Sequence, residues 1–223
     1  MRVFYLHGFA SSARSSKAAF FAAKFADHGI ELETPDFNEP DFSTLTVSRM
    51  IRQVCDLIGT DGDEAVVLIG SSLGGFVAVN AALECPDRID RVVLLAPALD
   101  FGGNRMRTLG DRGLDEWQRT NRLDVFHYAF GRIMPVHYEL YTDARRYDAI
   151  NARLAIPVQV FQGRRDDAVD PVSVENWAKA RPDHVELHML DDEHQLHASL
   201  EHIWREMERF LDLRGEKFQR DSC

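Results

Sequence analysis

The chain has 223 residues, of which 45% are hydrophobic and 28% are charged, and its formal net charge is −10. This is the composition of an ordinary globular protein that is long enough to bury one sizeable core. The negative charge argues against nucleic acid and against an anionic membrane surface as partners, because both are bound by a basic face. No apolar run approaches the ~20 residues that a membrane-spanning helix needs.

The three cysteines, Cys55, Cys85 and Cys223, are widely spaced and form neither a CxxC pair nor a Cys/His cluster with zinc spacing. We therefore expect reduced thiols in a cytoplasmic protein. The first residues, MRVFYLHGFASS, begin a strand almost at once and lack the long apolar core of a signal peptide. This agrees with the expectation of a cytoplasmic location.

The predicted elements alternate between strands and helices along most of the chain. In chain order they are a strand at 3–6, a helix at 15–28, a strand at 30–35, a helix at 47–58, a strand at 64–69, a helix at 73–83, a strand at 91–96, a strand at 158–162, a helix at 172–180, a strand at 185–189 and a helix at 198–211. This alternation predicts a parallel sheet that is covered by helices on both faces.

The segment 100–152 interrupts this alternation. It contains many aromatic residues and arginines but no clean strand pattern, and it is too long to be a bare loop in a compact domain. We predict a small helical lid inserted at 100–152 into a core formed by 1–99 and 153–215, with a frayed tail at 216–223.

The stretch VVLIGSSLGG is an apolar strand that ends in two serines enclosed by glycines. Residues 70–74 read G-S-S-L-G, which matches the pattern G-x-S-x-G. A strand that turns sharply into a helix strains its apex residue and leaves room only for very small side chains two positions away. The pattern predicts that Ser72 is the apex, where the positive end of the following helix favours an oxyanion. The alternative is a glycine-rich turn that only packs tightly.

A serine hydroxyl becomes a good nucleophile when a base takes its proton, and histidine is the usual base. His194 lies between the last predicted strand and the last helix, at the sheet edge that carries Ser72, and His197 is the second choice. His188 falls inside a strand and is expected to be packed there. The remaining histidines outside the first loop, His127 among them, are expected at the surface.

The base needs an acid that fixes its tautomer and stabilises its charged form. The loop FQGRRDDAVDP follows the preceding strand and offers Asp166, our choice, and Asp167, the alternative. Asp170 comes directly before Pro171, which is typical of a helix N-cap followed by proline at the first helical position. A solvated acidic loop is the competing interpretation of this stretch.

The sequence HGF at 7–9 stands where the first predicted strand ends. Gly8 allows the backbone to turn so that the amide of Phe9 faces the nucleophile, and the amide of Leu73 is the second candidate donor of an oxyanion hole. His7 is expected to hold this loop by hydrogen bonds.

Together these pieces resemble the α/β-hydrolase family. The resemblance covers nearly the whole chain, rests on YLHGFASS, GSSLGG, GRRDDAV and DDEHQL in the family's order, and points in particular to small bacterial serine esterases. It implies an α/β-hydrolase fold with a mostly parallel sheet of about six strands and helices on both faces. It also implies that Ser72 is the nucleophile, Asp166 the acid and His194 the base, with Phe9 and Leu73 as oxyanion donors. The chain departs from many members by opening directly on the strand before HGF.

A serine nucleophile beside two backbone amides suits acyl transfer to water. We expect a carboxylesterase-type serine hydrolase (EC 3.1.1) that cleaves small-molecule esters of short to medium acyl chains through an acyl-serine intermediate. No metal or organic cofactor is expected, and the substrate-binding residues and the oligomeric state are left open. A thioesterase or small peptidase with the same triad is the alternative, and a non-catalytic binding protein is a more distant one.

Overall fold

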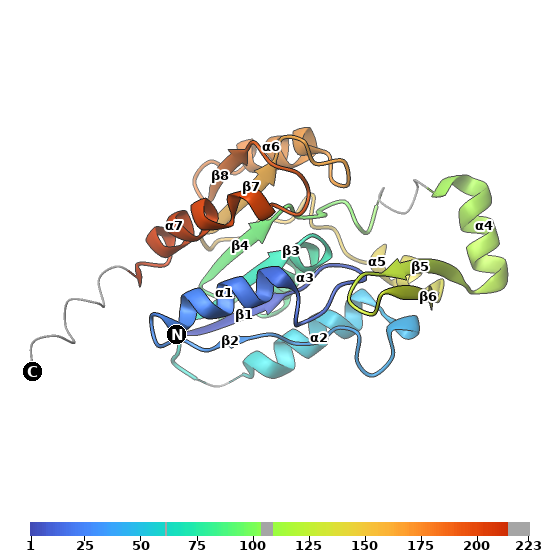
Figure 1. Cartoon of the computed structure of the whole chain (residues 1–223), viewed down its shortest axis with the longest axis horizontal. Helices are drawn as coiled ribbons and strands as arrows, with labels where there is room; N and C mark the ends of the chain where they lie inside the picture. Colours follow the sequence, from blue (N-terminus) through green and yellow to red (C-terminus); the bar gives the residue numbers. More distant parts are fainter. Residues whose placement is uncertain (61, 104–108, 214–223) are drawn as a thin grey trace, which may run out of the picture.

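The computed structural model describes residues 1–60, 62–103 and 109–213. Its centre is a parallel sheet of six strands in the order β2-β1-β3-β4-β7-β8 (Figure 1). These strands are β1 (Arg2–Leu6), β2 (Leu32–Glu33), β3 (Val66–Ser71), β4 (Arg91–Leu95), β7 (Val158–Gly163) and β8 (Val185–Leu190). The sequence predicted all six, although β2 is shorter than expected.

Helices cover both faces of this sheet, which confirms the predicted layers. Two helices, α1 (Ser16–Ala26) and α7 (Leu200–Phe210), pack on one face. Three others, α2 (Val47–Ile58), α3 (Leu73–Glu84) and α6 (Pro171–Lys179), pack on the opposite face. Every residue of β3 is buried, as expected for a central strand that is covered on both sides. Among the described residues, no helix is long and apolar enough to cross a membrane.

The carboxyl ends of the strands meet at one edge of the sheet. The register pairs Leu6 with Gly70, Ser71 with Leu95, and Gly163 with Leu190. Loops that leave parallel strands at matched positions emerge side by side. The chain thereby brings together segments more than 100 residues apart, including the stretches that contain HGF, Ser72, Asp166 and His194.

The segment 100–152 is not purely helical, and this part of the prediction is wrong. Between α4 (Gly110–Thr120) and α5 (Glu139–Ala144) it forms an antiparallel hairpin of β5 (Leu123–His127) and β6 (Arg132–Val136). Figure 1 shows this hairpin beside the end of the sheet. The strand signal is weak because β5 has the apolar residue Phe126 at an exposed position, which breaks the apolar–polar alternation, and because β6 contains a proline. Gly131, with φ 62°, makes the turn possible.

His127 is fully buried, although we expected it at the surface. Its ring lies against Phe42 and Phe130, with ring centroids 4.6 and 4.2 Å away, and its Nε2 lies 3.0 Å from the Asn38 side-chain oxygen. Burial lowers the pKa of His127. The sequence could not predict this because Phe42 and Asn38, which contact the ring, come from a distant part of the chain.

Cys55 in α2 and Cys85 at the end of α3 form a disulfide, with their Cα atoms 6.6 Å apart. The expectation of reduced thiols is therefore wrong for these two residues, and Cys223 lies outside the described residues. The pairing arises because α2 and α3 are neighbours on one face of the sheet. The cytoplasmic location stays a prediction, and a disulfide does not support it, since that compartment keeps thiols reduced.

The insertion is tied to the sheet domain by a buried carboxylate in α5. Asp143 accepts hydrogen bonds from the backbone amide of Ser48, at 2.7 Å, and from the Ser48 hydroxyl, at 2.5 Å. Asp143→Ala should lower the free energy of unfolding by about 1–3 kcal/mol, because it leaves these donors without their acceptor. Urea denaturation measures this. Asp124→Ala removes an exposed carboxylate of the same insertion and should leave stability unchanged; equal effects of the two substitutions would contradict the anchoring role.

Candidate active site

Ser72 lies at the apex of the turn from β3 into α3. Its backbone has φ 53° and ψ −115°, a conformation that is strained for any residue with a side chain. The turn is possible because its neighbours are glycines: a Cβ atom on Gly70 would overlap the carbonyl of Gly74, and one on Gly74 would overlap the carbonyl of Leu6. The Ser72 side chain remains partly exposed at the sheet edge.

Three side chains form a hydrogen-bonded row at this edge. His194 Nε2 lies 3.1 Å from Ser72 Oγ, and His194 Nδ1 lies 2.8 Å from Asp166 Oδ2. Ser72 follows β3, Asp166 follows β7 and His194 follows β8. The structure therefore brings together the three residues that the sequence placed in one site, with the histidine between the hydroxyl and the carboxylate. This order allows a proton to move from serine to imidazole while the carboxylate holds the ring.

The Asp166 carboxylate is completely buried but well supplied with hydrogen bonds. Besides His194 it accepts the backbone amides of Ala168 and Val169, at 2.9 and 2.8 Å, and the side-chain amide of Gln162, at 2.8 Å. Burial on its own would raise the pKa of Asp166, but these hydrogen bonds outweigh it, and the pKa lies below its ordinary value. Asp166 is therefore negatively charged at neutral pH and attracts a proton on His194.

The alternatives considered for these positions lie elsewhere. Asp167 is exposed, and Asp170 caps α6 by accepting the Val172 amide at 3.0 Å. His197 begins a short 3₁₀ helix, and its Nε2 lies 3.2 Å from the Ser16 hydroxyl rather than near Ser72.

Asp192, which the sequence pattern did not single out, positions the loop that carries His194. Its carboxylate accepts the backbone amides of Glu193 and Ser199, at 2.8 and 2.9 Å. Its carbonyl accepts the amide of Arg165, at 3.0 Å, which joins this loop to the one that carries Asp166. In sequence, Asp192 looks like its exposed neighbour Asp191, so no local signal distinguishes the two.

The backbone beside Ser72 presents two hydrogen-bond donors. Gly8 lies against the nucleophile: a Cβ atom placed on it would be 3.3 Å from Ser72 Cβ. Within the described residues, the amides of Phe9 and Leu73 donate no hydrogen bond to another part of the chain. Both donors therefore remain available to a ligand, as an oxyanion hole requires.

His7 holds this first loop in place, as expected. Its Nδ1 lies 2.9 Å from the carbonyl oxygen of Gly8, and its Nε2 accepts the backbone amide of Phe37 at 3.0 Å. The side chain is buried and packs against the Phe37 ring, so it supports the loop from beneath and does not face Ser72.

Comparison with known protein families places the chain in one of them. The sequence matches the uncharacterised protein family UPF0227 over residues 2–211. The chain belongs to UPF0227.

The structures most similar in shape include a putative hydrolase from Agrobacterium vitis, with a TM-score of 0.82, 22% identity, and coverage of 93% of this chain and 87% of that one. Est1E from Butyrivibrio proteoclasticus, solved with ferulic acid, has a TM-score of 0.79 and 20% identity over 94% of this chain and 87% of that one. Mouse α/β-hydrolase domain-containing protein 10 has a TM-score of 0.78 and 18% identity, and the match covers 94% of this chain and 89% of that one. This UPF0227 member therefore has the α/β-hydrolase fold, as predicted.

Curated relatives match only part of the chain. Lipase LipV from Mycobacterium tuberculosis is 33% identical over 86 residues, which is 37% of this chain and 33% of that protein. Putative esterase/lipase 2 from Mycoplasma genitalium is 32% identical over 117 residues, 47% of this chain and 41% of that protein. The chain thus spans less than half the length of these relatives, and it is related in sequence to esterases and lipases.

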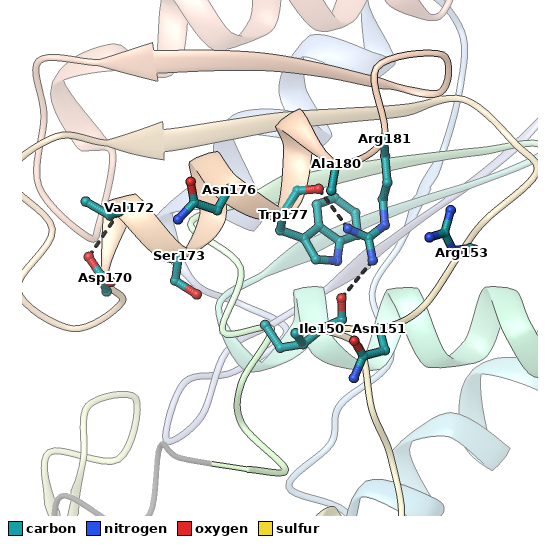
Figure 2. A pocket seen from close by; sticks show the side chains of 10 residues that line it. All are labelled: Ile150, Asn151, Arg153, Asp170, Val172, Ser173, Asn176, Trp177, Ala180 and Arg181. Carbon is teal, nitrogen blue, oxygen red and sulfur yellow. Dashed lines mark hydrogen bonds between the residues drawn. The ribbon is translucent and has the colours of Figure 1, made fainter.

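A separate cavity of about 660 Å³ lies beside α6 (Figure 2). Arg181 borders it and donates to the carbonyls of Ile150, Ala152 and Trp177, so its guanidinium already fixes the surrounding backbone. None of the cavity's lining residues belongs to the row at Ser72. We therefore do not assign the reaction to this cavity.

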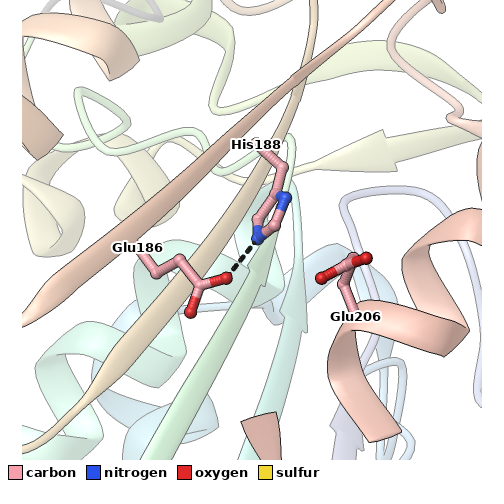
Figure 3. Close-up of side chains that lie close together, drawn as sticks. All are labelled: Glu186, His188 and Glu206. Carbon is pink, nitrogen blue, oxygen red and sulfur yellow. Dashed lines mark hydrogen bonds and ion pairs between the residues drawn. The ribbon is translucent and has the colours of Figure 1, made fainter. Parts of the chain in front are cut away.

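One cluster in this UPF0227 structure has ligand types that suit a metal ion. Glu186 and His188 in β8 and Glu206 in α7 place one ligand atom each within 4.8 Å of one another (Figure 3). Arg209, however, pairs with both carboxylates, and His188 Nε2 lies 2.7 Å from Glu186. The two carboxylates therefore belong to an ion-pair network around Arg209, and the cluster gives no support for a metal site over this simpler interpretation.

The turn at Ser72 leads to a test of the steric argument. Gly74→Ala should lower the free energy of unfolding by about 1–3 kcal/mol or more, because the new methyl group overlaps the Leu6 carbonyl. Thermal and urea unfolding measure this. Gly103→Ala is the matched control, since its nearest neighbour would be 3.7 Å away. Wild-type stability in Gly74→Ala would show that the turn is not sterically constrained.

Proposed function

We propose that this protein is a serine hydrolase that cleaves carboxylic esters through an acyl-Ser72 intermediate. The observation that carries the proposal is the row in which His194 lies 3.1 Å from Ser72 Oγ and 2.8 Å from Asp166. Nucleophile, base and acid within hydrogen-bond distance, beside two unpaired backbone donors, are the parts that acyl transfer requires.

The reaction follows from these positions. His194 Nε2 accepts the Ser72 proton as Oγ attacks the ester carbonyl carbon, and Asp166 stabilises the imidazolium that forms. The amides of Phe9 and Leu73 donate to the oxyanion. His194 then gives the proton to the leaving alcohol, which departs as the acyl-serine forms. Water, deprotonated by His194, attacks the acyl carbon and releases the acid and free Ser72.

Aromatic side chains at and beside Phe9 form an apolar surface near Ser72. This surface favours a substrate with an apolar acyl group. Phe9 is partly exposed, and its ring centroid lies 5.6 Å from that of Phe42 and 6.5 Å from that of Phe101. Both partners are buried, so this aromatic wall is fixed by the core. We propose esters of short to medium acyl chains as substrates. The relatedness to proteins named esterase and lipase points to the same chemistry.

A thioesterase or small peptidase would use the same three residues with a different leaving group. Hydrolysis rates measured on thioesters, amides and matched esters distinguish these two activities from that of an esterase. A binding protein that had lost its chemistry would be expected to lack a member of the row, whereas Ser72, His194 and Asp166 are all present and in contact.

The nucleophile is tested with p-nitrophenyl esters from acetyl to dodecanoyl. We expect cleavage that falls with chain length, and a loss of about 10⁴-fold or more in kcat for Ser72→Ala, because no other hydroxyl lies in the row. Ser71→Ala is the matched control: the neighbouring hydroxyl is buried and bonds to Tyr5, so kcat should stay near wild type. Equal cleavage by wild type and Ser72→Ala would contradict the proposal.

The acid is tested by two adjacent substitutions. Asp166→Asn should reduce kcat by on the order of 10³–10⁴-fold, since an amide no longer stabilises the imidazolium and favours the wrong tautomer. Asp167→Asn alters an exposed side chain and should leave kcat within about twofold. Steady-state kinetics decide between the carboxylates, and a large loss only in Asp167→Asn would reverse the assignment.

A further inference from the structure

Gln162 is a polar residue in one of the most deeply buried strands of the sheet. It belongs to β7, which pairs with β4 on one side and with β8 on the other. Every residue of this strand is buried, and no part of Gln162 is exposed. Strands in this position usually carry apolar side chains, because both faces of the sheet are covered. A glutamine here loses its hydration and needs hydrogen bonds in compensation.

The side-chain amide of Gln162 uses its donor end and leaves its acceptor end unpaired. Nε2 donates to Asp166 Oδ2 at 2.8 Å and to the carbonyl oxygen of Gly163 at 3.2 Å. A carboxylate only accepts hydrogen bonds, so the nitrogen of the amide must face it. Within the described residues, the buried Oε1 atom has no hydrogen-bond partner, which lowers stability. The contact with Asp166 therefore distinguishes glutamine from the apolar residues that would otherwise suit this position.

This contact is made to the carboxylate oxygen that holds the base. Asp166 Oδ2 accepts both Gln162 Nε2 and His194 Nδ1, each at 2.8 Å. The other oxygen, Oδ1, accepts the backbone amides of Ala168 and Val169. Those two amides lie in the same loop as Asp166, whereas Gln162 is part of the sheet. Gln162 thus joins the oxygen that faces the imidazole to the central sheet.

We propose that Gln162 is a positioning residue whose amide holds the Asp166 carboxylate against His194 and thereby aligns the base with Ser72. A carboxylate turns about its side-chain bonds, and its orientation is less restricted when it loses a donor. An imidazole that is held less firmly adopts the geometry for proton transfer less often. The proposal rests on the proposed function, because it assigns His194 the role of base.

Gln159 provides a matched control on the same strand. It is fully buried, and within the described residues its Oε1 also has no hydrogen-bond partner. Its Nε2 lies 3.4 Å from Glu186 Oε1 and 3.4 Å from His188 Nε2, rather than against Asp166. The two glutamines share residue type, strand and burial, and they differ in whether the amide contacts the acid.

The test compares Gln162→Met with Gln159→Met in steady-state kinetics on p-nitrophenyl butyrate, with circular dichroism to show that both are folded. Methionine is a flexible side chain that fills the space without a donor. In Gln162→Met we expect kcat to fall by about 10–100-fold, with KM within about twofold of wild type, because the alignment of the base changes and substrate contacts do not. In Gln159→Met both constants should stay within about twofold of wild type.

A second variant keeps the shape of the side chain. Gln162→Glu replaces the donor by an oxygen, which donates to Asp166 only while the new carboxyl group holds a proton. Two adjacent carboxyl groups cannot readily both be ionised, and a shared proton is held more completely as the pH falls. The kcat of Gln162→Glu relative to wild type should therefore recover as the pH is lowered, whereas that of Gln162→Met should not.

A third measurement needs no substrate. The proton on His194 Nδ1, which is donated to Asp166, gives an NMR resonance that is assigned by its loss in His194→Asn. We expect this proton to exchange with water faster in Gln162→Met than in wild type, because the carboxylate that binds it is held less firmly. In Gln159→Met it should exchange at the wild-type rate.

The proposal is overturned by wild-type kcat in Gln162→Met, by equal losses in the two methionine variants, or by a Gln162→Glu variant that stays as slow as Gln162→Met at every pH. Unchanged exchange of the His194 proton overturns it even if no ester is cleaved. If Ser72→Ala abolishes ester cleavage while Gln162→Met matches wild type, the proposed function stands and this inference fails. If wild type cleaves no ester but the exchange is faster in Gln162→Met, the positioning role stands and the proposed reaction fails.

Discussion

The tight passage of the chain from β3 into α3 is the constraint on which the site depends. Gly70 and Gly74 let backbone segments approach at distances that any Cβ atom would prevent, and Ser72 is thereby held at φ 53°. Strain of this kind persists only where the surroundings fix it, and here a fully buried strand and a helix of small residues do so. The hydroxyl consequently stands clear of the sheet at the edge where the other loops arrive.

That edge also gathers charges that would be unfavourable if buried singly. Asp166 and Asp192 are buried, but each receives at least two amide hydrogen bonds. Groups held this firmly need little rearrangement when charge develops on His194, which is how a fixed polar environment favours a reaction step. The same contacts join the loops after β7 and β8, so the geometry of the base depends on both.

The sequence predicts well what local chemistry determines. Ser72 follows from small residues at fixed spacing, and Asp170 from its position before Pro171; both lie where expected. The parallel sheet follows from the alternation of patterns. The burial of His127 against Asn38 and Phe42 and the pairing of Cys55 with Cys85 depend on contacts between distant segments, for which a single sequence holds no local signal. The hairpin at 123–136 is local, but the proline in its second strand weakens the strand pattern. Asp192 was missed because its sequence neighbour Asp191 is also an aspartate but is exposed, so the residue type does not show which of the two is buried.

The claim that Ser72 is an activated nucleophile is tested most directly with a fluorophosphonate. The folded protein is reacted with it, its mass is measured, and the modified peptide is identified. The account predicts one adduct per chain, on Ser72, formed much more slowly in His194→Ala, because the hydroxyl is activated only through the histidine. An adduct on another residue, no adduct on folded protein, or equal rates in wild type and His194→Ala would contradict the claim that Ser72 is an activated nucleophile.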